Sequence, residues 1–131
     1  MEKIIVQIGW CDNYCAASDE ILGCVACSDT IEGIKKEYRS ALDFHIKGML
    51  EDGDELPEKL KNEYELVFEL DTSAMLHSLD GIVTRKAIAK VTGINEALLT
   101  HYANGFRKPR PVQRQRIIDG IHQIGRELTL I

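Results

Sequence analysis

Apolar and polar residues alternate along two stretches of this chain with the period of two that is typical of a half-buried β-strand. The stretches are residues 3–10, KIIVQIGW, and residues 63–70, EYELVFEL. Their predicted inward-facing residues are Ile4, Val6, Ile8 and Trp10 in the first and Tyr64, Leu66, Phe68 and Leu70 in the second. Residues 14–17 and 24–28 read as two further short strands, joined by a connection over 18–23. The first three strands therefore form a predicted antiparallel meander.

A long amphipathic helix is predicted between the third and fourth strands. Thr30 is suited to cap its start. The apolar residues then recur at the spacing of a helix packed on a sheet, at Ile31, Ile34, Tyr38, Ala41, Leu42, Ile46, Met49 and Leu50. Residues 51–62, EDGDELPEKLKN, indicate a solvated connection. Because a crossover of this length permits parallel pairing, we expect the fourth strand beside the first, in the order β-β-β-α-β.

From Asp71 onward the pattern becomes helical, so we place a domain boundary between residues 1–71 and 72–131. A short helix over 73–79 points Met75, Leu76 and Leu79 inward. Two more helices follow, one capped by Thr84 and ending near Val91, the other capped by Asn95 and ending at Ala103, with Gly93 between them. A basic loop, NGFRKPRP over 104–111, precedes a last helix from about Val112 that carries Ile117, Ile121, Ile124 and Leu128. The predicted fold class is α+β.

Formal charge differs in sign between the two predicted domains. Residues 1–71 carry seven Lys or Arg against seventeen Asp or Glu, and residues 72–131 carry nine against four. Nucleic-acid phosphates attract the second segment and repel the first, whereas a basic protein would prefer the first. The contrast therefore favours two kinds of partner, with charge serving only solubility as the alternative. No uncharged stretch is long enough to span a membrane, and the chain reads as cytoplasmic.

Four cysteines lie close together in the sequence, at positions 11, 15, 24 and 27. Their spacing approaches a zinc pattern. However, residues three apart on a strand point to opposite faces, so Cys24 and Cys27 would not share one ion without a turn between them. We therefore expect reduced thiols and no metal or cofactor, with zinc binding as the alternative.

Residues 85–105, RKAIAKVTGINEALLTHYANG, have the order of features that a helix-turn-helix requires. Ala89 is small where two helices would cross, and Gly93 supplies the turn. Ile94, Leu99 and Tyr102 would lock the second helix onto the first. The outer face of that second helix then carries Asn95, Glu96, Thr100 and His101, which are able to read base edges in a major groove. Arg85, Lys86, Arg107, Lys108 and Arg110 suit phosphate contacts. A helical bundle with a solvated basic face is the alternative.

Residues 1–71 resemble the small domain of HicB-type antitoxins, a partial RNase H-like fold. The segments that carry the resemblance are KIIVQIGW, residues 12–33 with their LGCVA segment, and residues 39–58. The stretch GINEALLTHYANGFRKPRP over 93–111 resembles lambda-repressor-like helix-turn-helix domains, which some HicB proteins carry. Together the two resemblances cover nearly the whole chain.

The resemblance implies a type II antitoxin, in which the first domain occludes a small, basic, RNA-cleaving HicA-like toxin and the second represses its own operon at double-stranded operator DNA. The expected assembly is a homodimer or a higher even oligomer, because paired half-sites demand two reading helices. Nuclease activity is not expected, because the first strand lacks the carboxylate around which two-metal sites are built. The alternative is an orphan transcriptional regulator whose first domain binds another protein or a small molecule.

Overall fold

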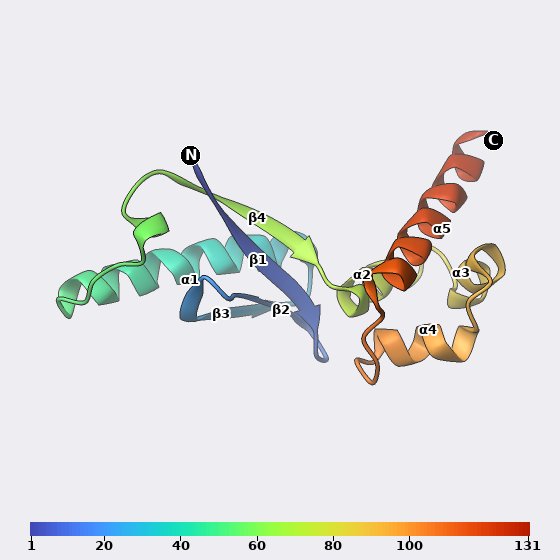
Figure 1. Cartoon of the computed structure of the whole chain (residues 1–131), viewed down its shortest axis with the longest axis horizontal. Coiled ribbons are helices and arrows are strands. Elements are labelled where there is room, and N and C mark those ends of the chain that lie inside the picture. The colour runs from blue at the N-terminus through green and yellow to red at the C-terminus, as the bar shows by residue number, and fades with distance from the viewer. The chain divides into compact units, whose positions relative to one another are not determined.

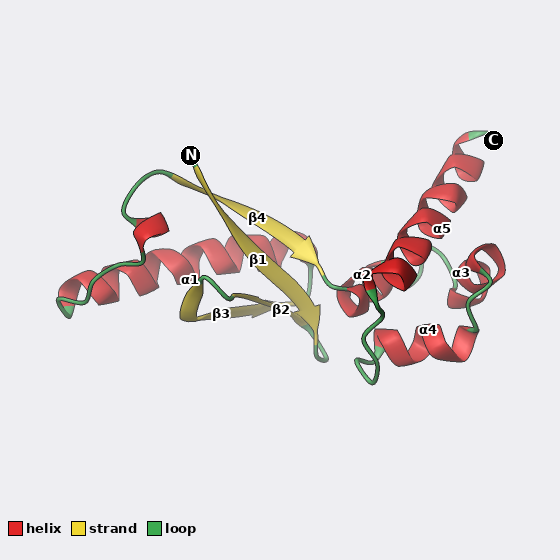
Figure 2. Cartoon of the chain, in the orientation of Figure 1, coloured by secondary structure: helices red, strands yellow, loops and turns green.

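The computed structural model describes residues 1–131 and is α+β, as expected, with a mixed four-stranded sheet and five α-helices. It divides into two compact units, Met1–Asp71 and Thr72–Ile131. Every strand belongs to the first unit, and the second unit contains helices only (Figure 2). The division falls at the residue where the hydrophobic period of the sequence changes.

The sheet of the first unit has the strand order β3-β2-β1-β4. Its strands are β1 (Glu2–Trp10), β2 (Tyr14–Ser18), β3 (Ile21–Ser28) and β4 (Tyr64–Leu70). β1 pairs antiparallel with β2, and β2 pairs antiparallel with β3. β4 lies parallel to β1, with Val6 opposite Phe68, which confirms the expected pairing of the last strand with the first.

Helix α1 (Ile31–Glu51) covers one face of this sheet (Figure 1). The Thr30 hydroxyl caps it by accepting the Gly33 N–H at 2.9 Å. The core beneath it contains Ile4, Val6 and Ile8 from β1 together with Ile34, Tyr38 and Leu42 from α1. The first unit has no second α-helix, and outward-pointing residues such as Val25 and Cys27 stay exposed on the opposite face.

Three predictions for this unit were wrong in detail. β3 begins at Ile21, so the hairpin connection is only Asp19 and Glu20, because Gly23, at φ +84°, lets the chain bulge and continue the strand. Leu50 is 61% exposed, since α1 runs on beyond the strands it covers (Figure 1). The connection over 51–62 is not wholly solvated, because a 3₁₀ turn (Glu58–Leu60) buries Leu60.

The second unit consists of four helices around one apolar cluster. They are α2 (Thr72–Ser78), α3 (Arg85–Thr92), α4 (Glu96–Ala103) and α5 (Pro111–Thr129). The buried members of the cluster are Leu76, Ile88, Ile94, Leu99, Tyr102, Ala103 and Ile117. Leu128, predicted on the inner face of α5, is exposed because that helix outruns its neighbours. None of the protein's helices combines the length and hydrophobicity that a membrane crossing requires.

Candidate nucleic-acid interface

Helices α3 and α4 are joined by a short turn whose geometry is set by side chains within it. Thr84 caps α3 by accepting the Ala87 N–H at 3.0 Å, and Asn95 caps α4 by accepting the Ala97 N–H at 2.8 Å. Gly93 has φ +75° and donates its N–H to the Ala89 carbonyl at 2.8 Å, closing α3 with a left-handed residue. Both predicted caps and the predicted glycine turn are therefore confirmed.

Thr92 adds a second lock at this turn. Its hydroxyl donates to the Ile88 carbonyl at 2.7 Å and accepts the Ile94 N–H at 3.2 Å. From α5, the Arg116 guanidinium donates to the Thr92 carbonyl at 2.7 Å. The turn between α3 and α4 is therefore held by hydrogen bonds between side chains and backbone as well as by packing.

The inner side of α4 is buried as predicted. Leu99 is fully buried, and Ile94 and Tyr102 are buried beside it. At the end of α4, the Ala103 carbonyl accepts the Ser73 hydroxyl at 2.6 Å and lies 2.9 Å from Nε2 of His77. A carbonyl only accepts, so Nε2 is the nitrogen that donates here. Helix α2 therefore holds the C-terminal end of α4. The side of α4 that carries Glu96 and His101 is exposed.

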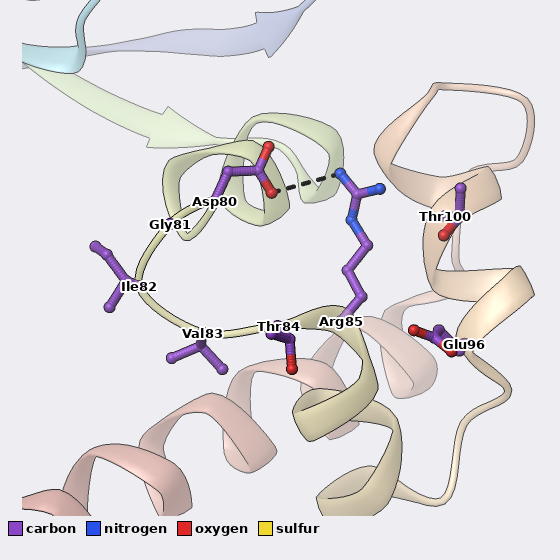
Figure 3. A pocket seen from close by; sticks show the side chains of 8 residues that line it. All are labelled: Asp80, Gly81, Ile82, Val83, Thr84, Arg85, Glu96 and Thr100. Atoms are coloured by element: carbon purple, nitrogen blue, oxygen red, sulfur yellow. Dashed lines mark ion pairs between the residues drawn. The ribbon is translucent and has the colours of Figure 1, made fainter.

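A hollow of about 570 Å³ opens between the loop that follows α2 and the start of α4 (Figure 3). Its lining includes Arg85 from α3 and Glu96 and Thr100 from α4. The Arg85 guanidinium reaches across it toward Asp80, with the Nη2 and Oδ1 atoms 3.6 Å apart. The Arg85 Nε atom is buried and has no hydrogen-bond partner. The Arg85 guanidinium in this hollow therefore has an N–H group free to donate, and it lies beside Glu96 and Thr100 of α4.

A second hollow, of about 500 Å³, lies beside the loop after α4. It is lined by Arg107, Lys108 and Arg110 together with Tyr102 and Gln113. The loop is held to the end of α4, because the N–H groups of Phe106 and Arg107 both donate to the His101 carbonyl. Three cations on one short ordered loop make a concentrated site for an anionic ligand such as a phosphate.

The structure thus gathers most of the predicted DNA-contacting residues into two clusters. Arg85, Glu96 and Thr100 line the first hollow, and Arg107, Lys108 and Arg110 line the second. The remaining three, Lys86, Asn95 and His101, are exposed outside both. The Asn95 Oδ1 atom is committed to capping α4, and the His101 ring packs edge-on against Phe106 with centroids 6.0 Å apart.

Sequence reasoning missed several participants. Asp80 is the acidic partner of Arg85, and Arg116 braces the α3–α4 turn from a helix far along the chain. The Arg116 contact joins residues 24 positions apart, and the Asp80 contact spans the loop between α2 and α3, so the repeat of a single helix predicts neither of them. Phe106 is 76% exposed directly before the basic residues of the loop, and an aromatic residue beside a run of cations was a sign of a contact surface in the sequence.

The interface belongs to a helical unit that carries nine basic against four acidic residues, within an α+β chain. No protein-family model matches the chain. It is 27% identical over 108 residues, covering 80% of each chain, to an uncharacterized 14.9 kDa protein in the rep-hol intergenic region of Haemophilus phage HP1 (strain HP1c1).

Proposed function

We propose that this protein is a transcriptional regulator that binds operator DNA through a lambda-repressor-like helix-turn-helix formed by α3 and α4. One observation carries the proposal: α4 is locked against α3 through the left-handed Gly93 turn, with an outward side that adjoins two cation-bearing hollows. A helix presented in this way is what the major groove accepts, and the flanking cations match the phosphates on either side of it.

Individual roles follow from where each side chain lies. Arg107, Lys108 and Arg110 contact phosphates and fix the register of the protein on the duplex. Glu96 and Thr100, on the outer side of α4, contact base edges, with the carboxylate suited to accept from the cytosine amino group. Lys86 and His101 extend the contact surface at its margins.

The first unit is proposed to bind a basic protein, in the manner of the HicB-type antitoxins that the sequence resembles. Seventeen acidic residues against seven basic ones support this, because a toxin that cleaves RNA carries a basic surface. The sheet also leaves one face uncovered by α1, in keeping with the partial RNase H-like domain of that family. The protein would then neutralise a small HicA-like toxin and repress the operon that encodes both, as a homodimer or higher even oligomer.

The DNA proposal is tested by fluorescence anisotropy with a labelled duplex from the protein's own promoter, titrated at several salt concentrations. Arg107→Ala and Lys108→Ala should each weaken binding and lower the slope of log affinity against log salt by about 1. Arg126→Ala removes the same charge from the exposed last turn of α5 and should leave the slope unchanged. Equal effects of all three variants, or none, would contradict a localised interface.

The antitoxin proposal needs a separate experiment. The genes that flank the one for this chain are searched for a small basic protein, which is coexpressed with the chain, and both growth and co-purification are measured. Rescue of growth together with a stable complex is expected. If the promoter is bound but no toxin is neutralised, the orphan-regulator alternative takes the place of the antitoxin.

A further inference from the structure

Two of the four cysteines, Cys15 and Cys27, lie on the uncovered side of the sheet, at the end near the β1–β2 turn. Cys15 on β2 is directly opposite Cys27 on β3, and it is also paired with Gly9 of β1. Cys11 lies in the turn after β1. Cys27 and Cys11 are exposed, Cys15 is half-buried, and Cys24 is buried on the other side, where α1 packs.

Directly opposed residues of an antiparallel pair already have the separation that a disulfide needs. Their Cα atoms lie about 4.5 or 5.5 Å apart, depending on the type of pair, and both values fall within the range of disulfide-bonded cysteines. The Cys27 thiol is also close enough to Cys15 to raise the pKa of that thiol, as expected for side chains that project from the same face of the sheet. Bond formation would therefore require little movement of the backbone.

We propose that Cys15 and Cys27 form a modification site, a dithiol that a hydroperoxide oxidises to a cross-strand disulfide within one chain. In the first step the Cys27 thiolate attacks the peroxide, so that an S–O bond forms, the O–O bond breaks, and water or an alcohol leaves. In the second step the Cys15 sulfur attacks the Cys27 sulfenic acid, so that the S–S bond forms and water leaves. Both thiol hydrogens end in these products, and the peroxide is the two-electron oxidant.

The surroundings of the two thiols decide which one reacts with the oxidant first. The neighbouring Cys27 thiol is the largest cause that raises the pKa of Cys15, and together with burial it brings that pKa to about 11. Cys15 therefore keeps its proton, while the exposed Cys27 sulfur meets the oxidant first. No group of three or more His, Cys, Asp or Glu side chains in the protein is arranged to share a metal ion, so the pair has no third ligand beside it.

The test treats the reduced full-length protein with hydrogen peroxide at a slight molar excess, alkylates the remaining thiols under denaturing conditions, so that the buried Cys24 also reacts, and measures the intact mass. Two of the four cysteines should escape alkylation, and the chain should lose about 2 Da, the mass of the two hydrogens removed. All four cysteines lie on one tryptic peptide, so the digestion uses endoproteinase Asp-N, which separates residues 1–11, 12–18 and 19–28. A linked pair 12–18 and 19–28 is expected, with fragmentation assigning the bond to Cys27.

Matched variants identify the partners. Cys27→Ser should abolish the linkage and leave Cys15 open to alkylation, whereas Cys11→Ser should leave the linkage intact. Circular dichroism checks that both variants are folded, and the exposure of both positions favours this. A bond to Cys11, a dimer on a non-reducing gel, or peroxide consumption that ends in sulfinic acid would each overturn the proposal. The result is independent of DNA binding, because all four cysteines lie in residues 1–71.

Discussion

Gly120 on α5 should be sensitive to the smallest possible enlargement, because α5 meets α3 there. A Cβ atom built at Gly120 would lie 2.4 Å from the Cγ2 methyl of Thr92, far inside van der Waals contact. That methyl is not free to rotate away. The Thr92 hydroxyl is fixed by its hydrogen bonds to the Ile88 carbonyl and the Ile94 N–H, so a change of rotamer would break both.

The magnitude follows from opposing effects. Gly→Ala in a helix interior gains about 1 kcal/mol of helix propensity. Overpacking costs about 1–3 kcal/mol, and each hydrogen bond lost from Thr92 adds about 1 kcal/mol. Because a change of the Thr92 rotamer breaks both of its hydrogen bonds, Gly120→Ala should destabilise the helical unit by about 2–4 kcal/mol. Gly125→Ala is the matched control on the same helix: its Cβ would meet nothing within 4 Å, so that variant should gain up to about 1 kcal/mol.

Urea denaturation followed by far-ultraviolet circular dichroism measures the free energy of unfolding, and hydrogen exchange of peptides from residues 72–131 assigns the change to the helical unit. The double variant Gly120→Ala with Thr92→Ser provides the decisive comparison. Serine removes the obstructing methyl but keeps the hydroxyl, so it should restore most of the lost stability. If Gly120→Ala matches Gly125→Ala in stability, or if Thr92→Ser gives no rescue, the crowding argument is refuted.

Three further changes test other parts of the chain. Hydrogen bonds from Lys59 and the Ile5 N–H lower the pKa of the Glu20 carboxyl. The ionised carboxylate therefore stabilises the fold above the pKa of the unfolded state, and this stabilisation is lost as the pH falls through the pKa of the folded state. Glu20→Gln should flatten the acid limb of a plot of melting temperature against pH. Tyr38→Phe removes a buried hydroxyl that has no hydrogen-bond partner, so the unfolding free energy should be unchanged or raised by about 1 kcal/mol, and a clear loss in denaturation would contradict this. Asn95→Ser replaces the amide oxygen that caps α4 with a hydroxyl oxygen, which also accepts, so thermal stability should persist while the loss of the amide as a base contact lowers affinity in a mobility shift. Asn95→Ala removes the cap as well and should cost about 1 kcal/mol of stability.

Much of the local structure could be read from the sequence. The caps at Thr30, Thr84 and Asn95 and the left-handed turn at Gly93 are where the pattern predicted them. Each depends on groups within about four positions along the chain, so the necessary information is contiguous in the sequence. The opposite orientations of Cys24 and Cys27 follow from strand geometry in the same way.

The candidate interface was predictable in its residue types and only partly in its arrangement. The sequence predicted the basic loop as a cluster of cations, and the structure places Arg107, Lys108 and Arg110 of this loop around one hollow. Arg85 was predicted as a simple phosphate contact, yet it lies in a hollow opposite Asp80 with one nitrogen buried. That environment is assembled from three elements, and no spacing rule within one helix specifies it.

The sequence by itself determined the two hydrophobic periods, the place where one replaces the other, the contrast in charge, and the ends of the short helices. Only the tertiary structure decided that β3 continues past a bulge at Gly23 and that Cys15 faces Cys27. It also decided that Leu50 and Leu128 lie beyond the elements they were predicted to pack against. The physical reason is range: periodicity and capping are set by neighbours in the chain, whereas strand register, the end of a packing surface and the meeting of two side chains depend on residues far away in the sequence.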